Sequence, residues 1–122
     1  MSIRIAGTGS YVPERILSNA DLEKMVETND EWIRTRTGIE ERRIASPEQA
    51  TSDLAYEACL KALDMAGIKG EEVDAIIVGT ITPDYVFPST GCILQDRLGA
   101  KGAFCFDLEA ACSGLLFSLE VA

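Results

Sequence analysis

The fold prediction for this sequence of 122 residues rests first on residues 73–80, VDAIIVGT. The run is almost continuously apolar, which is typical of a strand that is covered on both faces in a parallel sheet. A second apolar run, residues 103–108 (AFCFDL), predicts a neighbouring strand. The run at residues 3–6 predicts a further strand, which ends at the glycine pair Gly7 and Gly9.

Residues 52–66, SDLAYEACLKALDMA, carry the clearest helical pattern in the sequence. Apolar side chains recur there every three or four positions, as on the buried face of a helix. Thr51 or Ser52 is expected to cap the start of this helix, and Gly67 marks its end.

Two further helical patterns, residues 90–98 and 113–122, complete an alternation of strands and helices. This order indicates an α/β protein with a mainly parallel sheet and helices packed on it. We expect residues 1–122 to form a single partial domain. The sequence stops inside the last helical pattern, so we expect a truncated piece of a longer protein. Such a piece exposes apolar surface and should form a dimer or larger species.

Two shorter helices are expected nearer the N-terminus. Ser18 and Asp21 have the spacing of a capping box at the start of the first. Residues 30–36 predict the second helix, and Gly38 is expected to end it.

The composition argues against several classes of protein. The formal net charge of −9 argues against nucleic acid as the main partner, because phosphate contacts need surplus basic residues. No apolar run approaches the roughly 20 residues of a membrane span. The N-terminus lacks the pattern of a secretory signal, so a cytoplasmic protein is expected. The sequence has no histidine and no Cys-x-x-Cys pair, so no metal site is expected.

The basic residues are unevenly distributed on this acidic chain. Four of the eleven fall within ten residues: Arg34, Arg36, Arg42 and Arg43. The cluster is compatible with a local cationic site for an anionic ligand. A solvated helix face with its following loop explains the same charges equally well.

Cys112 lies between the strand pattern and the last helical pattern, in the stretch DLEAACSGLLF of residues 107–117. The other cysteines, Cys59, Cys92 and Cys105, lie within helix or strand patterns and are expected to be buried free thiols. At a helix N-terminus, unpaired N–H groups and the helix dipole lower the pKa of a thiol and can stabilise an oxyanion. Position alone supports a nucleophile and a buried cap-region cysteine equally, because no histidine base is present.

Three blocks of the sequence resemble the β-ketoacyl-(acyl carrier protein) synthase III family of the thiolase-fold superfamily. They are residues 7–45, beginning GTGSYVPERILSNADLEKMVETNDEWIRTRTG, residues 78–100 (VGTITPDYVFPSTGCILQDRLGA) and residues 107–122 (DLEAACSGLLFSLEVA). The resemblance implies the N-terminal part of a thiolase-like fold. It covers essentially the whole chain, but only the first, shorter part of such an enzyme, whose C-terminal half is absent from this chain.

The resemblance implies an acyltransferase that starts type II fatty-acid synthesis. Cys112 would accept an acetyl or short acyl group from coenzyme A, which is a substrate and not a permanently bound cofactor. The acyl group would then condense with malonyl-(acyl carrier protein) with loss of carbon dioxide. The family draws a histidine and an asparagine from its second half, so we expect the isolated fragment to be inactive in condensation. The parent enzyme would be a homodimer.

The resemblance also implies binding residues. Thr28, Trp32 and Arg36 match the coenzyme A-binding segment, with the indole against the adenine and Arg36 and Thr28 at the nucleotide end. The alternative makes Trp32 a helix anchor and the arginines a solvated face. Phe87 matches a residue that lines the acyl pocket of the partner subunit. A loop aromatic that closes the domain's own core is the alternative for Phe87.

Other functions remain open on the sequence. The parent could be a related thiolase-superfamily synthase that takes another acyl primer or is of the hydroxymethylglutaryl type, with Cys112 as the nucleophile in either. A different class is a non-catalytic thiolase-like interaction module that pairs with another chain and carries no chemistry.

Overall fold

The computed structural model describes residues 4–122, which separate into two compact units. The smaller unit is Val12–Glu48. The larger unit joins the described residues up to Tyr11 to Gln49–Ala122. The single partial domain expected over residues 1–122 stays a prediction, because a division into compact units does not test whether they fold together.

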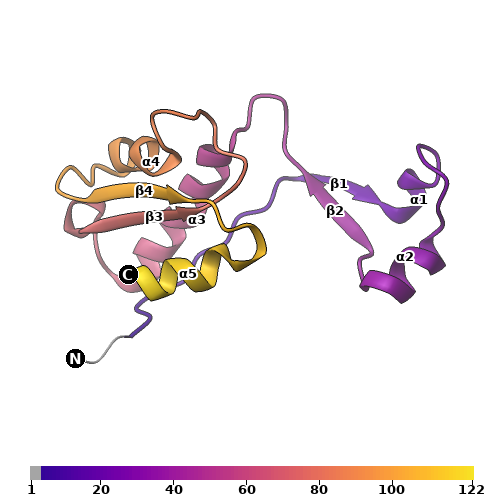
Figure 1. Cartoon of the computed structure of the whole chain (residues 1–122), viewed down its shortest axis with the longest axis horizontal. Coiled ribbons are helices and arrows are strands. Elements are labelled where there is room, and N and C mark those ends of the chain that lie inside the picture. The colour runs from indigo at the N-terminus through magenta and orange to yellow at the C-terminus, as the bar shows by residue number, and fades with distance from the viewer. Residues whose placement is uncertain (1–3) are drawn as a thin grey trace. The chain divides into compact units, whose positions relative to one another are not determined.

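The larger unit is built on a parallel pair of strands, β3 (Ala75–Gly79) and β4 (Phe104–Leu108). Ile76 lies opposite Cys105, and Gly79 lies opposite Leu108. The unit also contains three helices and two short 3-10 turns: α3 (Thr51–Ala66), η1 (Gly70–Glu72), α4 (Thr90–Leu98), η2 (Ala111–Ser113) and α5 (Gly114–Val121). The expected α/β architecture with a parallel sheet and packed helices is therefore confirmed (Figure 1).

The core of the larger unit lies on one face of this strand pair. Leu94 of α4 is almost completely buried against Ile76, together with Ala100 and Ala103. α3 adds Ala55, Tyr56 and Cys59 to the same cluster. Because side chains alternate along a strand, Ile76 and its register partner Cys105 face α3 and α4, while Gly79 faces the other way.

α5 lies on the opposite side of the strand pair from α4 (Figure 1). Its first residue, Gly114, meets the end of β3 at Gly79. A Cβ placed on Gly79 would lie 3.1 Å from the carbonyl carbon of Gly114, which is closer than ordinary contact. The absence of a side chain at Gly79 therefore sets where α5 begins.

The smaller unit contains an antiparallel strand pair and two helices. β1 (Arg15–Ser18) pairs with β2 (Glu41–Ile44), and the helices are α1 (Asn19–Leu22) and α2 (Asp30–Thr37). The expected capping box is confirmed, because the Ser18 hydroxyl accepts from the Asp21 backbone N–H at 3.2 Å and Asp21 Oδ2 accepts from the Ser18 N–H at 3.2 Å. Gly38 ends α2 in the left-handed region, with φ of 72°.

The structure corrects two local predictions. The expected strand at residues 3–6 does not form at residues 4–6, which pair with no strand among the described residues, and Ile3 lies outside those residues. The N-cap of α3 is Ala50, not Thr51 or Ser52. The Ala50 N–H donates to Asp53 Oδ2 at 2.9 Å, and the Ser52 N–H donates to Asp84 Oδ1 at 2.9 Å. Carboxylates thus satisfy the helix start in place of a hydroxyl.

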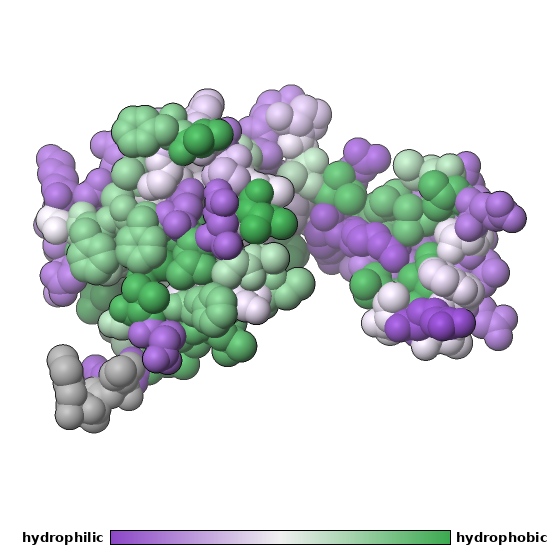
Figure 2. All heavy atoms as spheres, in the orientation of Figure 1, coloured by the Kyte–Doolittle hydropathy of each residue, from purple (hydrophilic) through white to green (hydrophobic). Residues whose placement is uncertain are grey.

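Apolar side chains gather on the surface of the larger unit (Figure 2). Leu115 and Leu116 of α5 are 71% and 68% exposed, and Phe104 on β4 is 62% exposed. No helix among residues 4–122 is long and apolar enough to cross a membrane.

Candidate functional site

Cys112 lies on the η2 turn, two residues before α5 begins. Ala111 directly before it has φ of 44°, in the left-handed region, which costs a residue with a Cβ about 1 to 2 kcal/mol. Strained backbone of this kind is often found at functional sites. The turn leaves Cys112 exposed, and no side chain caps the N-terminus of α5. Backbone N–H groups at a helix start can stabilise an oxyanion.

Cys112 differs from the other three cysteines in exposure. Cys59, Cys92 and Cys105 are free thiols within helices or strands, as the patterns indicated, but they are half-buried and not buried as expected. Burial raises the pKa of Cys59, and burial is also the main cause that raises the pKa of Cys105 to about 11. Cys112 is therefore the thiol that an external reagent reaches most readily. In this chain it is not the buried cap-region cysteine that the sequence left open as an alternative.

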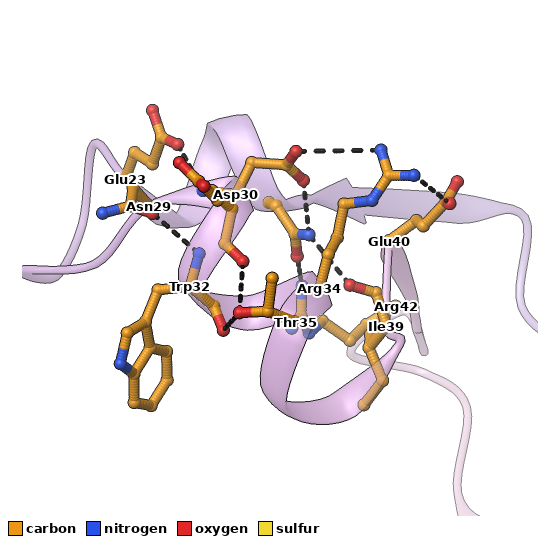
Figure 3. A network of polar contacts seen from close by, with 11 residues as sticks. Glu23, Asn29, Asp30, Trp32, Arg34, Thr35, Ile39, Glu40 and Arg42 are labelled. Carbon is orange, nitrogen blue, oxygen red and sulfur yellow. Dashed lines mark hydrogen bonds and ion pairs between the residues drawn. The ribbon is translucent and has the colours of Figure 1, made fainter.

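The N-terminus of α2 presents the Trp32 indole. Asn29 Oδ1 accepts from the Trp32 backbone N–H at 2.8 Å and caps the helix. The indole is 56% exposed and points away from the polar network of this unit (Figure 3). A hollow of about 260 Å³ lies beside it, lined by Glu27, Thr28, Asn29 and Trp32. Ile33, at 6% exposure, is the residue that anchors α2, so Trp32 is not needed for that role.

Arg36 lies over the Trp32 ring, with its guanidinium carbon 5.9 Å from the ring centroid. The neighbouring arginines are already engaged. Arg34 pairs with Glu40 at 3.0 Å, and Arg43 pairs with Glu41 at 3.3 Å. Arg42 donates to Asn19 Oδ1. Within the described residues Arg36 makes no ion pair, so it is the member of the arginine cluster left for an anionic ligand.

Asn19 is a buried hydrogen-bonding residue of this unit that the sequence analysis did not predict. It is 2% exposed, and its Nδ2 donates to Asp30 Oδ1 at 2.7 Å and to the Ile39 carbonyl at 2.9 Å. Arg42 donates to Asn19 Oδ1, so Asn19 bonds to three residues, Asp30, Ile39 and Arg42, which Figure 3 labels. A helix-start asparagine beside a serine cap has the same pattern whether its side chain is buried or solvated, so no sequence signal distinguishes it.

Phe87 lies in the loop between β3 and α4 and is 88% exposed. In this chain it does not close the core of its own unit. Asp84 anchors the loop, because its carboxylate accepts from the Ser52 backbone N–H at 2.9 Å and from the Ser52 hydroxyl at 2.5 Å. The Phe87–Pro88 peptide bond is cis.

The structure therefore brings some of the predicted residues together. Thr28 and Trp32 line one hollow, and Arg36 covers the indole, all within the smaller unit. Cys112 and Phe87 belong to the larger unit. Residues 4–122 hold no group of three or more histidine, cysteine, aspartate or glutamate side chains that could bind a metal ion.

Comparisons with known proteins show which sequences and structures this chain resembles. No protein-family model matches the chain. A β-ketoacyl-[acyl-carrier-protein] synthase III of Xanthomonas campestris pv. campestris is 60% identical over 119 residues, which are 98% of this chain and 37% of the relative.

Solved structures agree. The crystal structure of 3-oxoacyl-[acyl-carrier-protein] synthase III from Aquifex aeolicus matches with a TM-score of 0.95 and 50% identity, over 98% of this chain and 39% of that one. The priming β-ketosynthase of the R1128 polyketide pathway matches with a TM-score of 0.94 and 39% identity, over 98% of this chain and 36% of that one. Over the part that it spans, 37% of the Xanthomonas relative and 39% of the Aquifex chain, this chain is therefore similar in sequence to β-ketoacyl-[acyl-carrier-protein] synthase III and shares its thiolase-like fold.

Proposed function

We propose that this chain carries the nucleophile and the coenzyme A-recognition segment of a condensing acyltransferase that starts type II fatty-acid synthesis. An acetyl or short acyl group moves from coenzyme A to Cys112 and condenses with malonyl-(acyl carrier protein). The observation that carries the proposal is the exposed Cys112 at the uncapped start of α5, in a chain 60% identical to a β-ketoacyl-[acyl-carrier-protein] synthase III.

In the first step the Cys112 thiolate attacks the thioester carbonyl carbon. A carbon–sulfur bond forms to Cys112, the bond to the coenzyme A sulfur breaks, and coenzyme A leaves as its thiolate. Backbone N–H groups at the start of α5 stabilise the oxyanion of the tetrahedral intermediate. The strained Ala111 supports this role, because it turns the backbone so that Cys112 is presented outside the fold.

In the second step malonyl-(acyl carrier protein) loses carbon dioxide, and the resulting carbanion attacks the acyl carbon on Cys112. A carbon–carbon bond forms, the carbon–sulfur bond to Cys112 breaks, and Cys112 leaves as its thiolate. The developing enolate needs oriented neutral donors. This chain contains no histidine. We therefore expect the isolated 122 residues to accept an acyl group at most, and not to complete the condensation.

The hollow at α2 supports binding of coenzyme A. The Trp32 indole stacks on the adenine, while Arg36 and Thr28 contact the phosphate-bearing end of the nucleotide. The exposed ring, the adjacent hollow of about 260 Å³ and a guanidinium without an acidic partner among the described residues all favour this assignment over a helix anchor.

Phe87 completes the acyl pocket of a second subunit in a homodimer. Its 88% exposure supports this role, because contact with a partner surface would remove this large apolar side chain from water. A phenylalanine there shortens the pocket and favours short primers. The protein acts in the cytoplasm on these substrates, without a permanent cofactor.

A second candidate keeps the same nucleophile but changes the primer. It is favoured by the likeness, at a TM-score of 0.94, to a priming β-ketosynthase of a polyketide pathway. Acylation of the intact protein by a series of acyl-coenzyme A thioesters separates the two, because a fatty-acid starter enzyme prefers the acetyl group.

The test of the main proposal is mass spectrometry of the intact protein after incubation with acetyl-coenzyme A. Wild type should gain one acetyl group, and the Cys112→Ala variant should gain none. The Cys59→Ser variant is a matched control that should behave as wild type. An acetyl group that persists in Cys112→Ala would sink the assignment.

A further inference from the structure

Cys92 and Cys105 form a pair of sulfur atoms that the acyl-transfer chemistry does not use. The Cys105 thiol donates to Cys92 Sγ at 3.3 Å, although the two residues belong to different elements, α4 and β4. Both thiols are free. A sulfur–sulfur distance of 3.3 Å leaves a movement of about 1.3 Å to the bond length of a disulfide.

Two contacts between α4 and β4 keep these sulfur atoms close to each other. Asp107, two residues after Cys105 on β4, accepts from the N–H groups of Thr90 and Gly91 at 2.7 and 2.9 Å. Gly91 lies so close to the strand that an added Cβ would be 3.2 Å from the Cys105 Cβ. The first turn of α4 is therefore fixed against β4 at the level where Cys92 meets Cys105.

The two thiols have different environments. The Ser89 hydroxyl donates to Cys92 Sγ at 3.3 Å and is the main cause that lowers the pKa of Cys92, with the Cys105 thiol as a second donor. The Asp107 carboxylate acts in the opposite direction. Burial raises the pKa of Cys105 to about 11, so that thiol stays protonated. Cys92 is therefore the sulfur suited to attack an oxidant, while Cys105 passes its proton to the departing hydroxyl when it attacks the oxidised Cys92.

We propose that Cys92 and Cys105 form a dithiol oxidation site, at which a hydroperoxide converts the two thiols to a disulfide that ties the first turn of α4 to β4. The Cys92 thiolate attacks the hydroperoxide, the O–O bond breaks, and a sulfenic acid forms while an alcohol or water leaves. Cys105 then attacks the Cys92 sulfur, and the S–O bond breaks with release of water. Two thiols lose two electrons and two protons, and the hydroperoxide is reduced.

This site is independent of the proposed acyl transfer. Cys112 lies after β4 and forms no part of it. The test therefore uses the intact protein with Cys112→Ala, which removes the exposed thiol without touching the pair. The protein is treated with hydrogen peroxide, remaining thiols are alkylated, and the product is digested with trypsin.

The sequence suits this digestion, because Arg97 and Lys101 lie between Cys92 and Cys105. Cleavage separates the two cysteines unless a disulfide joins their peptides. We expect a linked peptide pair that is lighter by two hydrogen atoms than the two reduced peptides, and a thiol reductant should separate it.

Four variants and one change of condition test the geometry. Cys92→Ser and Cys105→Ser should each abolish the linked pair, while Cys59→Ser, a half-buried thiol outside the pair, should retain it. Ser89→Ala should slow formation of the linked pair several-fold. Protein unfolded in urea should give a much lower yield at the same peroxide concentration. A yield that is equal in folded and unfolded protein, or oxidation of Cys92 to a sulfinic acid without a linked pair, would overturn the proposal.

Discussion

The two units of this protein differ in the interactions that stabilise the interior of each. In the larger unit the buried side chains are mostly apolar, with Leu94 and Ile76 at the centre. In the smaller unit Asn19 is only 2% exposed. Its side chain forms hydrogen bonds with Asp30 on α2, with Arg42 on β2 and with the carbonyl of Ile39, which precedes β2. Hydrogen bonds contribute about 1 kcal/mol each, and they constrain geometry more strictly than apolar contact does.

The difference suits what each unit presents. The smaller unit holds an indole and a guanidinium at fixed positions on a short helix, which the polar network around Asp30 achieves with little apolar surface. The larger unit holds a strained turn at Cys112 on a packed sheet. Substitutions that test the comparison should therefore act through cavity formation in one unit and through unpaired polar groups in the other.

The largest effect is expected from Leu94→Ala, which opens a cavity at the centre of the apolar core. Leu94 is 1% exposed, and this change should lower the free energy of unfolding by about 3 kcal/mol. Urea unfolding followed by circular dichroism measures it. Leu60→Ala on α3, where the side chain is 41% exposed, is the matched control and should cost less than half as much. Equal losses would contradict the placement of the core.

The next effect is expected from Asn19→Ala in the smaller unit. The change leaves Asp30 and the Ile39 carbonyl without a buried partner, and should cost about 2 kcal/mol. Hydrogen exchange should report faster opening of α2 amides, with the amides of α4 unchanged. Asn29→Ala, which removes only a helix cap, should cost about 1 kcal/mol. A larger loss from Asn29→Ala would reverse the ranking.

Ala111→Gly tests the strain at the Cys112 turn and should stabilise the protein. Glycine adopts φ of 44° without a Cβ penalty, so the free energy of unfolding should rise by about 1 kcal/mol. Ala110→Gly is the control, because Ala110 has φ of −128° and gains nothing from glycine. That control should lose a few tenths of a kcal/mol or more. A loss of stability in Ala111→Gly would show that the turn is not strained.

The smallest effect concerns Asp21 in the capping box. The Ser18 hydroxyl, followed by Lys24, lowers the pKa of Asp21 from 3.8 to about 2. A carboxyl with a lowered pKa stabilises the folded state above its unfolded pKa, and this contribution is lost as the pH falls from about 4 toward 2. Nuclear magnetic resonance titration of the Asp21 carboxyl measures the midpoint. Ser18→Ala should move that midpoint back toward 3.8, while Thr35→Ala, on α2, should leave it in place.

The sequence predicted the larger unit well where local signals are strong. The apolar runs at residues 73–80 and 103–108 became β3 and β4, because strands covered by helices need apolar side chains on both faces. α4 spans Thr90–Leu98, as the pattern at residues 90–98 predicted, with Ser89 and Gly99 as its caps. In contrast, the antiparallel pair β1 and β2 was missed, because RILS and ERRI are short, charged and largely exposed.

For the candidate site, the sequence predicted where Cys112 lies in the order of elements, but not the backbone conformation that exposes it. The left-handed φ of Ala111 follows from how the chain passes from β4 to α5, and alanine itself gives no sign of it. The contact between Cys92 and Cys105 was likewise hidden, because each residue alone has the pattern of a core position. Long-range contacts of this kind depend on the packing of α4 on β4.

The close approach of Gly79 to Gly114 has a consequence for recombining segments between homologous synthases. A chimera whose donor segment brings any side chain to position 79 would push the start of α5, and Cys112 with it, away from the end of β3. Position 114 is more permissive, since an added Cβ there would lie 3.4 Å from the Gly79 Cα, at ordinary contact distance. Crossover points between these positions are therefore safe only when the donor of β3 ends it with glycine.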